Sequence, residues 1–214
     1  MKILIIGATG KVGGKTVDAC LDAGHAVTGF GRSVEELDAG RPGLSVHKGD
    51  VTSDADLAAA MPGHDAVILT FGAIPSRETI LHKPDLCEKG TRKTIDAMKA
   101  AGVPRLVAMT AIGAGDSKGH GRFVFRNIIE PVLLDRIMQD RTAQEEVVRA
   151  SDLTEWVIVR PTELSDEDPA PVRVIRDLEA EPEPTTISRT DVGTFLARMA
   201  TDTAEDGTTI LITN

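Results

Sequence analysis

Short runs of Ile, Val, Leu and Ala recur along the chain, and stretches with helical spacing of apolar residues separate them. The apolar runs cover residues 3–7, 26–31, 44–50, 65–73, 105–111, 155–161 and 208–213. The helical stretches cover residues 11–23, 34–37, 53 onwards, 84–101, two segments within 123–150, and 191–201. Strands that are apolar on both faces are typical of a parallel sheet covered by helices. The pattern therefore predicts an α/β fold, a Rossmann-like doubly wound parallel sheet with helices on both faces.

The alternation breaks after residue 161, where proline and acidic residues replace the periodic pattern. Residues 165–174 read SDEDPAPVRV, and residues 178–184 read LEAEPEP. We expect an excursion around residues 162–188 that forms a small C-terminal substrate lobe, after which the chain returns to the sheet. A length of 214 residues suits one domain, so residues 1–214 are predicted to form a single unit.

Charge and cysteine content narrow the range of partners. A net charge of −9 and an isoelectric point near 5.1 disfavour binding to nucleic acid or anionic lipid. Cys20 and Cys87 have no CxxC spacing, which is typical of buried thiols in a reducing compartment. No apolar stretch has the length of a signal sequence or membrane span, so a cytoplasmic location is expected. The histidines are scattered, so no metal site is predicted. The sequence leaves open whether the protein is a monomer or a homodimer.

A glycine-rich turn joins the first predicted strand to the first helix. In a βαβ unit the first glycine permits the turn, the second lets backbone approach a diphosphate, and the third allows close packing of helix and strand. The residues expected to bind a dinucleotide here are Gly7, Thr9, Gly10, Lys11, Val12 and Gly13. A tight turn without a ligand is the alternative, and the complete βαβ context favours binding.

The end of the second strand indicates which dinucleotide binds. Arg32 and Ser33 stand where an acidic residue would accept hydrogen bonds from the ribose 2′-hydroxyl of NADH. A guanidinium and a hydroxyl suit an additional 2′-phosphate instead, so NADPH (NADP) is the favoured cofactor. Glu35 and Glu36 lie close enough to weaken this preference, and a surface arginine without a ligand is the alternative.

Two further strand ends are predicted to contact the cofactor, because ligands of open parallel sheets bind there. Asp50 and Val51 close the third strand and are expected beside the adenine, although Asp50 is equally suited to cap the next helix. Thr70, Phe71 and Gly72 end the fourth strand and are expected beside the ribose and phosphates.

Six motifs occur in order over nearly the whole chain. They are GATGKVG at 7–13, Arg32 with Ser33, GDV at 49–51, GAGDS at 113–117, DRTAQE at 140–145 and VRP at 159–161. This set resembles the atypical short-chain dehydrogenases, and within them the NAD(P)H-binding group similar to flavin reductases and biliverdin-IXβ reductases. The resemblance implies a Rossmann-like sheet, an NADPH site and hydride transfer to a planar conjugated acceptor. Such an acceptor is a flavin, with FMN or FAD as the substrate, or a linear tetrapyrrole.

The chain contains no tyrosine. Short-chain dehydrogenases of the main type use a tyrosine as general acid, so that mechanism is excluded here. An acceptor with a conjugated ring system does not need a general acid from the protein, because it can take its proton from water after it has accepted the hydride. The resemblance implies that Thr110 and Ala111 lie beside the nicotinamide, where Thr110 would donate a hydrogen bond to the acceptor. A strand-end hydroxyl that satisfies local backbone is the alternative for Thr110.

Arg141 and Glu145 share one face of a predicted helix at i, i+4 spacing. From the resemblance, Arg141 is expected to orient cofactor or substrate, and Glu145 would shuttle a proton only if burial raised its pKa. A solvated ion pair between the two is the alternative, and for Glu145 it is the favoured one. The resemblance also implies that Pro161 and Thr162 pack on the nicotinamide, whereas a proline that merely ends a strand is the competing interpretation.

The glycine-rich loop 113–123 has a composition that permits movement and is a candidate lid over the acceptor. Phe123 and Phe125 are candidates for lining a flavin slot, although core packing is the commoner role of phenylalanine.

Two other functions remain open at the level of sequence. A dinucleotide-sensing regulatory protein without turnover would account for the missing tyrosine. A sugar-nucleotide epimerase or dehydratase is disfavoured, because that chemistry needs the same tyrosine.

Overall fold

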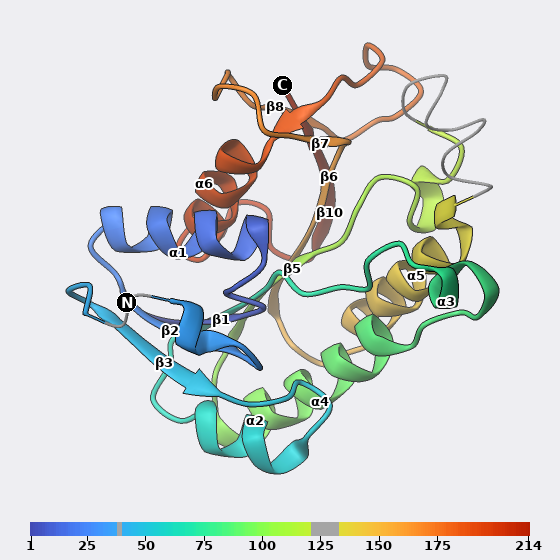
Figure 1. The fold of residues 1–214 in the computed structure, drawn as a ribbon. Coiled ribbons are helices and arrows are strands. Elements are labelled where there is room, and N and C mark those ends of the chain that lie inside the picture. The colour runs from blue at the N-terminus through green and yellow to red at the C-terminus, as the bar shows by residue number, and fades with distance from the viewer. Residues whose placement is uncertain (38–39, 121–132) are drawn as a thin grey trace.

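The computed structural model describes residues 1–37, 40–120 and 133–214, and an eight-stranded sheet forms its centre (Figure 1). The strands of this sheet are β1 (Lys2–Ile6), β2 (Ala26–Gly31), β3 (Leu44–Lys48), β4 (Ala66–Leu69), β5 (Arg105–Met109), β6 (Glu155–Pro161), β8 (Arg173–Ile175) and β10 (Thr208–Thr213). A second, two-stranded sheet consists of β7 (Leu164–Ser165) and β9 (Ile187–Ser188).

Helices connect most of these strands. They are α1 (Lys11–Asp22), α2 (Asp54–Ala60), α3 (Arg77–Leu81), α4 (Leu86–Ala101), α5 (Asp135–Arg149) and α6 (Arg189–Met199), with 3-10 turns η1 (Val34–Glu36) and η2 (Gly115–Ser117). No helix among the described residues combines the length and the apolar character needed to cross a membrane.

The order of the strands confirms the predicted α/β, Rossmann-like fold. The sheet runs β3-β2-β1-β4-β5-β6-β10-β8, and every neighbouring pair is parallel except β10 with β8. The chain therefore winds outward from β1 in one direction and from β4 in the other. Ligands of such sheets bind at the carboxyl ends of the strands where the direction of winding changes.

Alternate residues of β1 belong to different cores, which explains why the strand is apolar throughout. Ile3 and Ile5 pack on the face covered by α1 and α6, and Leu4 and Ile6 pack on the face covered by α2, α4 and α5 (Figure 1). All four side chains are essentially inaccessible to solvent. The double-sided burial inferred from the apolar runs is thus present in the fold.

The excursion after β6 contains structure that the sequence pattern did not predict. Ile175 of β8 is buried against Leu211 of β10 and Ile112, so a three-residue strand covers the outer edge of the sheet. Helix α3 was also missed; it is a single short helix that Ser76 and Thr79 cap reciprocally. Segments this short carry too few residues to display a periodic pattern.

Part of one prediction falls outside the described residues. The first of the two helices expected within 123–150, together with Phe123 and Phe125, lies in or overlaps residues 121–132. The second is α5.

Both cysteines are buried free thiols, as predicted. Cys20 lies in α1 and Cys87 in α4, and burial raises the pKa of Cys20 to about 12 and that of Cys87 to about 11. Thiols with such pKa values remain protonated at neutral pH.

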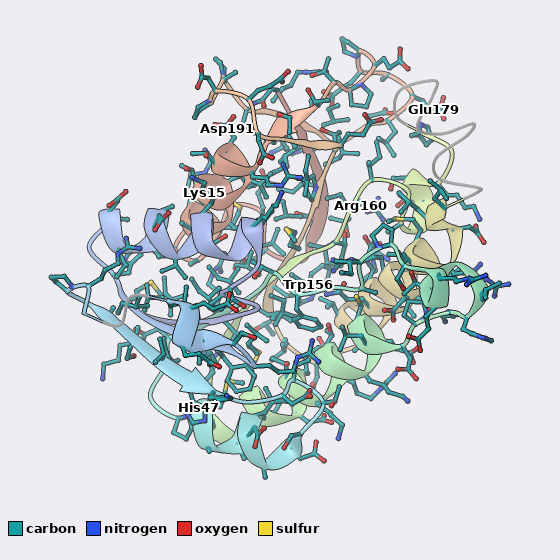
Figure 2. The ribbon with its side chains drawn as sticks, in the orientation of Figure 1. Lys15, His47, Trp156, Arg160, Glu179 and Asp191 are labelled. Carbon is teal, nitrogen blue, oxygen red and sulfur yellow. The ribbon has the colours of Figure 1, made fainter. Side chains whose placement is uncertain are left out.

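Helices α1 and α6 approach each other closely because residue 193 is glycine. A Cβ atom added to Gly193 would lie 2.6 Å from the carbonyl carbon of Lys15 and 2.8 Å from the amide nitrogen of Thr16. Figure 2 shows Lys15 on α1 and Asp191 on α6 on the same side of the sheet. Backbone contact at this point fixes the start of α6 relative to the start of α1.

We predict that Gly193→Ala destabilises the protein although alanine is the better helix former. The added methyl group meets backbone atoms of α1, so the free energy of unfolding should fall by about 1–3 kcal/mol in urea denaturation. Gly14→Ala in α1 is the control, because its Cβ would have Ala8 O as nearest neighbour at 3.9 Å. Gly14→Ala should raise the free energy of unfolding by about 0.5–1 kcal/mol, and a similar gain for Gly193→Ala would contradict the packing argument.

Candidate functional site

A cavity of about 630 Å³ opens at the carboxyl ends of β1, β2, β4 and β5, where the winding of the sheet changes direction. Most residues predicted to bind a dinucleotide line it. These are Gly7, Thr9, Gly10, Lys11, Val12, Arg32, Ser33, Asp50, Val51, Thr70, Phe71 and Gly72, together with Arg141. Sites for small molecules and cofactors commonly have this size and position.

The floor of the cavity is the turn between β1 and α1, which only glycine permits. Gly7 has a φ of +92°, and a Cβ there would lie 2.7 Å from the amide nitrogen of Phe71. A Cβ on Gly13 would collide with the Gly7 carbonyl and lie 2.9 Å from Thr70 Oγ1. Gly13 thus packs helix against strand, as expected, and does not itself line the cavity.

The N-terminus of α1 is left available to an anion. Gly10 is the N-cap residue and provides no capping side chain, and the first turn contains no acidic residue. The main-chain amides of a first helical turn need acceptors, and the helix dipole favours a negative one. The arrangement is suited to a phosphate group at the mouth of α1.

At the end of β2, Arg32 is exposed and lines the cavity, where its charge helps to lower the pKa of the Asp50 carboxyl. Arg32 forms no hydrogen bond or ion pair with any residue that the structure describes. Glu35, which weakened the prediction of NADPH, is paired with Lys48 at 3.2 Å and does not line the cavity. Glu36 is likewise absent from the lining.

Asp50 forms a local turn and does not cap the following helix. Its Oδ1 accepts hydrogen bonds of 2.8 Å from the amide and from the hydroxyl of Thr52, which hold the pKa of Asp50 below its usual value. Ser53 caps α2 instead, by accepting from the amide of Asp56. The Asp50 carboxylate therefore remains an ionised acceptor on the cavity wall.

Arg141 spans from α5 to the far end of the cavity and is buried, so a solvated position is wrong for it. Its Nη1 donates to Met109 O at 3.0 Å and to Gln144 Oε1 at 2.9 Å. A Cβ on Gly72 would lie 2.7 Å from the guanidinium carbon, so the missing side chain at Gly72 is what lets Arg141 enter. The cation thus lies at the ends of β4 and β5.

Glu145 is completely buried, and the favoured expectation of a solvated pair with Arg141 is wrong. Arg160 reaches it from β6 with Nε and Nη2 at 2.8 and 2.6 Å, and Arg149 Nη2 lies at 2.9 Å. The i, i+4 partner of Glu145 is Arg149 and not Arg141, and Arg160 of β6 adds a tertiary contact to the same carboxylate. Two arginines on one buried carboxylate leave no free oxygen for a proton shuttle.

The Glu145 cluster also fixes two neighbouring groups. Burial by itself would lower the pKa of Arg160, but the hydrogen bonds and charge of Glu145 outweigh it and raise that pKa. Arg160 Nη1 also lies 2.6 Å from Asp116, where this pairing overcomes the effect of burial and lowers the pKa of Asp116. Arg160 and Asp116 therefore remain charged at neutral pH.

Thr110 donates its hydroxyl hydrogen to Glu145 Oε1 at 2.8 Å, neither to local backbone nor into the cavity. Thr110, Ala111, Pro161 and Thr162 do not line the cavity, so their roles beside the nicotinamide stay predictions. Pro161 ends β6 in register with Ile212, which is the competing interpretation of that residue.

Several lining residues were not identified from the sequence. They are Ile6, Phe30, Gly31, Gly49, Thr52, Ile74, Leu86, Met109, Leu164 and Arg189. Most adjoin predicted positions on the strand ends. Leu164 and Arg189 are different, since they flank the excursion and reach the cavity only because β7 pairs with β9. No local sequence pattern predicts the pairing of β7 with β9.

With this geometry in view, the comparisons identify the family. Residues 7–203 match the model of the NAD(P)H-binding family. The chain therefore belongs to this family of atypical short-chain dehydrogenases.

Individual similar proteins cover different shares of the chain. A 3-beta-hydroxysteroid dehydrogenase of Mycolicibacterium neoaurum is 32% identical over half of this chain, which spans only 31% of that protein. The uncharacterized sugar epimerase YhfK of Bacillus subtilis is 29% identical over 84% of this chain and 80% of its own length. The structure of ChuY, an anaerobilin reductase from Escherichia coli O157:H7, matches all of this chain and 97% of that chain, with a TM-score of 0.80 and 22% identity.

We predict that the two carboxylates bound by Arg160 differ strongly in their effect on stability. Glu145→Gln leaves the buried Arg160 without the counter-charge of a buried carboxylate and should lower the free energy of unfolding by about 3–5 kcal/mol. The side chain of Asp116 is 81% exposed, so Asp116→Asn should cost no more than about 1 kcal/mol. Equal losses in urea denaturation of the two variants would contradict the assignment of Glu145 as the centre of the cluster.

Proposed function

We propose that this protein is an NADPH-dependent oxidoreductase that transfers hydride to a planar conjugated acceptor such as a flavin or a linear tetrapyrrole. The observation that carries the proposal is the cavity, because one continuous lining joins Arg32 at one end, the glycine turn in the middle and Arg141 at the other. A dinucleotide that carries a 2′-phosphate on its adenosine ribose needs groups in this spatial order: a cation for the 2′-phosphate, main-chain amides for the diphosphate, and space for the nicotinamide.

The residues present fit such a cofactor. The uncapped N-terminus of α1 and the glycines at 7 and 10 would hold the diphosphate, since Gly10 provides no capping side chain and the first turn of α1 has no acidic residue. Arg32 and Ser33 would bind the 2′-phosphate, and Asp50 would accept from the adenine amino group. Met109 and Arg141 line the opposite end, which is left for the nicotinamide.

The side chains of the protein favour an acceptor that needs no proton donor from the protein. The cofactor, when bound, supplies a hydride, and the product also needs one proton. No tyrosine exists to donate it, Thr110 already donates to Glu145, and Glu145 is held by two arginines. Arg141 stays charged and can orient a carbonyl or carboxylate, but it cannot act as an acid. A conjugated acceptor that takes its proton from water fits these residues best.

A second candidate is a dinucleotide-sensing protein without turnover. The absence of tyrosine, together with the occupied hydrogen bonds of Thr110 and Glu145, favours it. It differs from the oxidoreductase in one measurable way, because it binds NADPH tightly and reduces no acceptor. Although YhfK carries the name of a sugar epimerase, that chemistry needs the tyrosine that this chain lacks.

We predict that Arg32→Ala weakens binding of NADPH and leaves NADH binding unchanged. Loss of the guanidinium removes a charge-assisted contact to the 2′-phosphate, so the Kd for NADPH should rise on the order of tenfold or more. Isothermal titration with both cofactors measures the effect. Arg92→Ala on α4, which lies outside the cavity lining, is the control. Equal weakening of both cofactors by Arg32→Ala would refute a contact to the 2′-phosphate.

We predict that the wild-type protein accelerates the oxidation of NADPH by FMN, followed by the loss of NADPH absorbance. Thr110→Val should lower kcat by less than about 100-fold, the lower end of what a general acid contributes. A rate equal to that in buffer, in a protein that binds NADPH, would favour the sensor instead. A larger loss in Thr110→Val would make Thr110 a proton donor.

A further inference from the structure

A small cluster of charges crosses the mouth of the cavity beside the glycine turn. Asp166, from the excursion, lies 2.6 Å from Arg189 Nη1 and 3.9 Å from Lys11 Nζ. Lys11 begins α1 and Arg189 begins α6, and both residues line the cavity. One carboxylate thus stands between two cations at the point where the N-terminus of α1 opens.

The fold holds Arg189 firmly in this position. Ser188 accepts a hydrogen bond from the amide of Asp191 at 3.0 Å to cap α6, and β9 pairs with β7 immediately before it. The Asn214 side chain donates to Asp191 and accepts from the Ser188 amide. Because Gly193 brings α6 against the backbone of α1, the first residue of α6 cannot drift away from the glycine turn.

The charges at this mouth are unbalanced without an anion. Only Nη1 of Arg189 is bonded to a residue that the structure describes, although the side chain is just 21% exposed. Asp166 is 70% exposed and reaches Lys11 only at the limit of an ion pair. A half-buried guanidinium with unused donors, a lysine and the positive end of α1 exceed what one exposed carboxylate neutralises.

We infer that Arg189 binds the diphosphate bridge of the dinucleotide, and that Asp166 is the counter-ion that the diphosphate displaces. The inference rests on the proposed function, since it assumes that a dinucleotide occupies the cavity. A diphosphate carries more charge than a carboxylate and meets the helix N-terminus directly, so the exchange is favourable. One of the groups that bind the diphosphate thereby comes from the start of α6, directly after the C-terminal excursion, and not from the glycine turn.

Variants of Arg189 and of Asp166 distinguish binding of the diphosphate by Arg189 from a purely structural ion pair that holds the excursion in place. If Arg189 only ties down the excursion, Arg189→Met and Asp166→Asn break the same ion pair and weaken cofactor binding alike. If Arg189 binds the diphosphate, the two variants act in opposite directions. Arg189→Met loses a ligand contact, whereas Asp166→Asn removes a competitor.

The experiment measures the Kd of NADPH and NADH for four proteins: the wild type, Arg189→Met, Asp166→Asn and Arg198→Met. Arg198 is an exposed arginine in the last turn of the same helix and serves as the control. We expect Arg189→Met to raise both Kd values on the order of tenfold, leaving their ratio unchanged because the diphosphate is common to both cofactors. Asp166→Asn should lower both Kd values by up to about fivefold, the worth of an exposed ion pair. Thermal denaturation without cofactor checks that each variant folds.

Three results would overturn the inference. They are an unchanged Kd in a folded Arg189→Met, a loss confined to NADPH, and weaker binding in Asp166→Asn. A wild-type protein that binds neither cofactor would instead refute the proposed function, and the inference would fall with it.

Discussion

The contact between the Gly7 carbonyl and Gly13 is the constraint on which the site depends. It brings the first turn of α1 directly against the end of β1, an approach that a side chain at Gly13 would prevent. The amides of α1 then open at the point where β1 and β4 wind in opposite directions. The cavity follows from this turn, because strand ends, loops and the helix residues Leu86, Arg141 and Arg189 are arranged around it.

Arg141 and Glu145 are spaced i, i+4 on α5, a spacing that predicts an ion pair, but in the fold they lie in different environments. Arg141 points toward Gly72 and the cavity, and Glu145 lies one turn further on in a buried cluster with Arg160. The first residue is available to a ligand and the second is committed to holding α5 against β6. This division explains how a chain without tyrosine can keep a charged site while lacking an obvious proton donor.

The parts of the molecule that were predictable from sequence are those set by local pattern. The turn Gly7 to Gly13 and the strand ends at Arg32 and Asp50 follow from apolar runs and the residues directly after them. The contact of Arg160 with Glu145 and the approach of Arg189 were not predictable, because they arise between different elements of the fold. The i, i+4 rule holds for Glu145 with Arg149, but it gives no information about Arg160, which approaches the same carboxylate from β6.

The burial of both natural thiols has a consequence for fluorescent labelling of the protein. Cys20 and Cys87 are the only cysteines, both are inaccessible, and both have pKa values far above neutrality. Maleimide reagents react with exposed thiolates, so the native chain should resist them. A single cysteine introduced on the surface of the excursion would therefore accept a fluorophore selectively, with no need to remove the natural ones first.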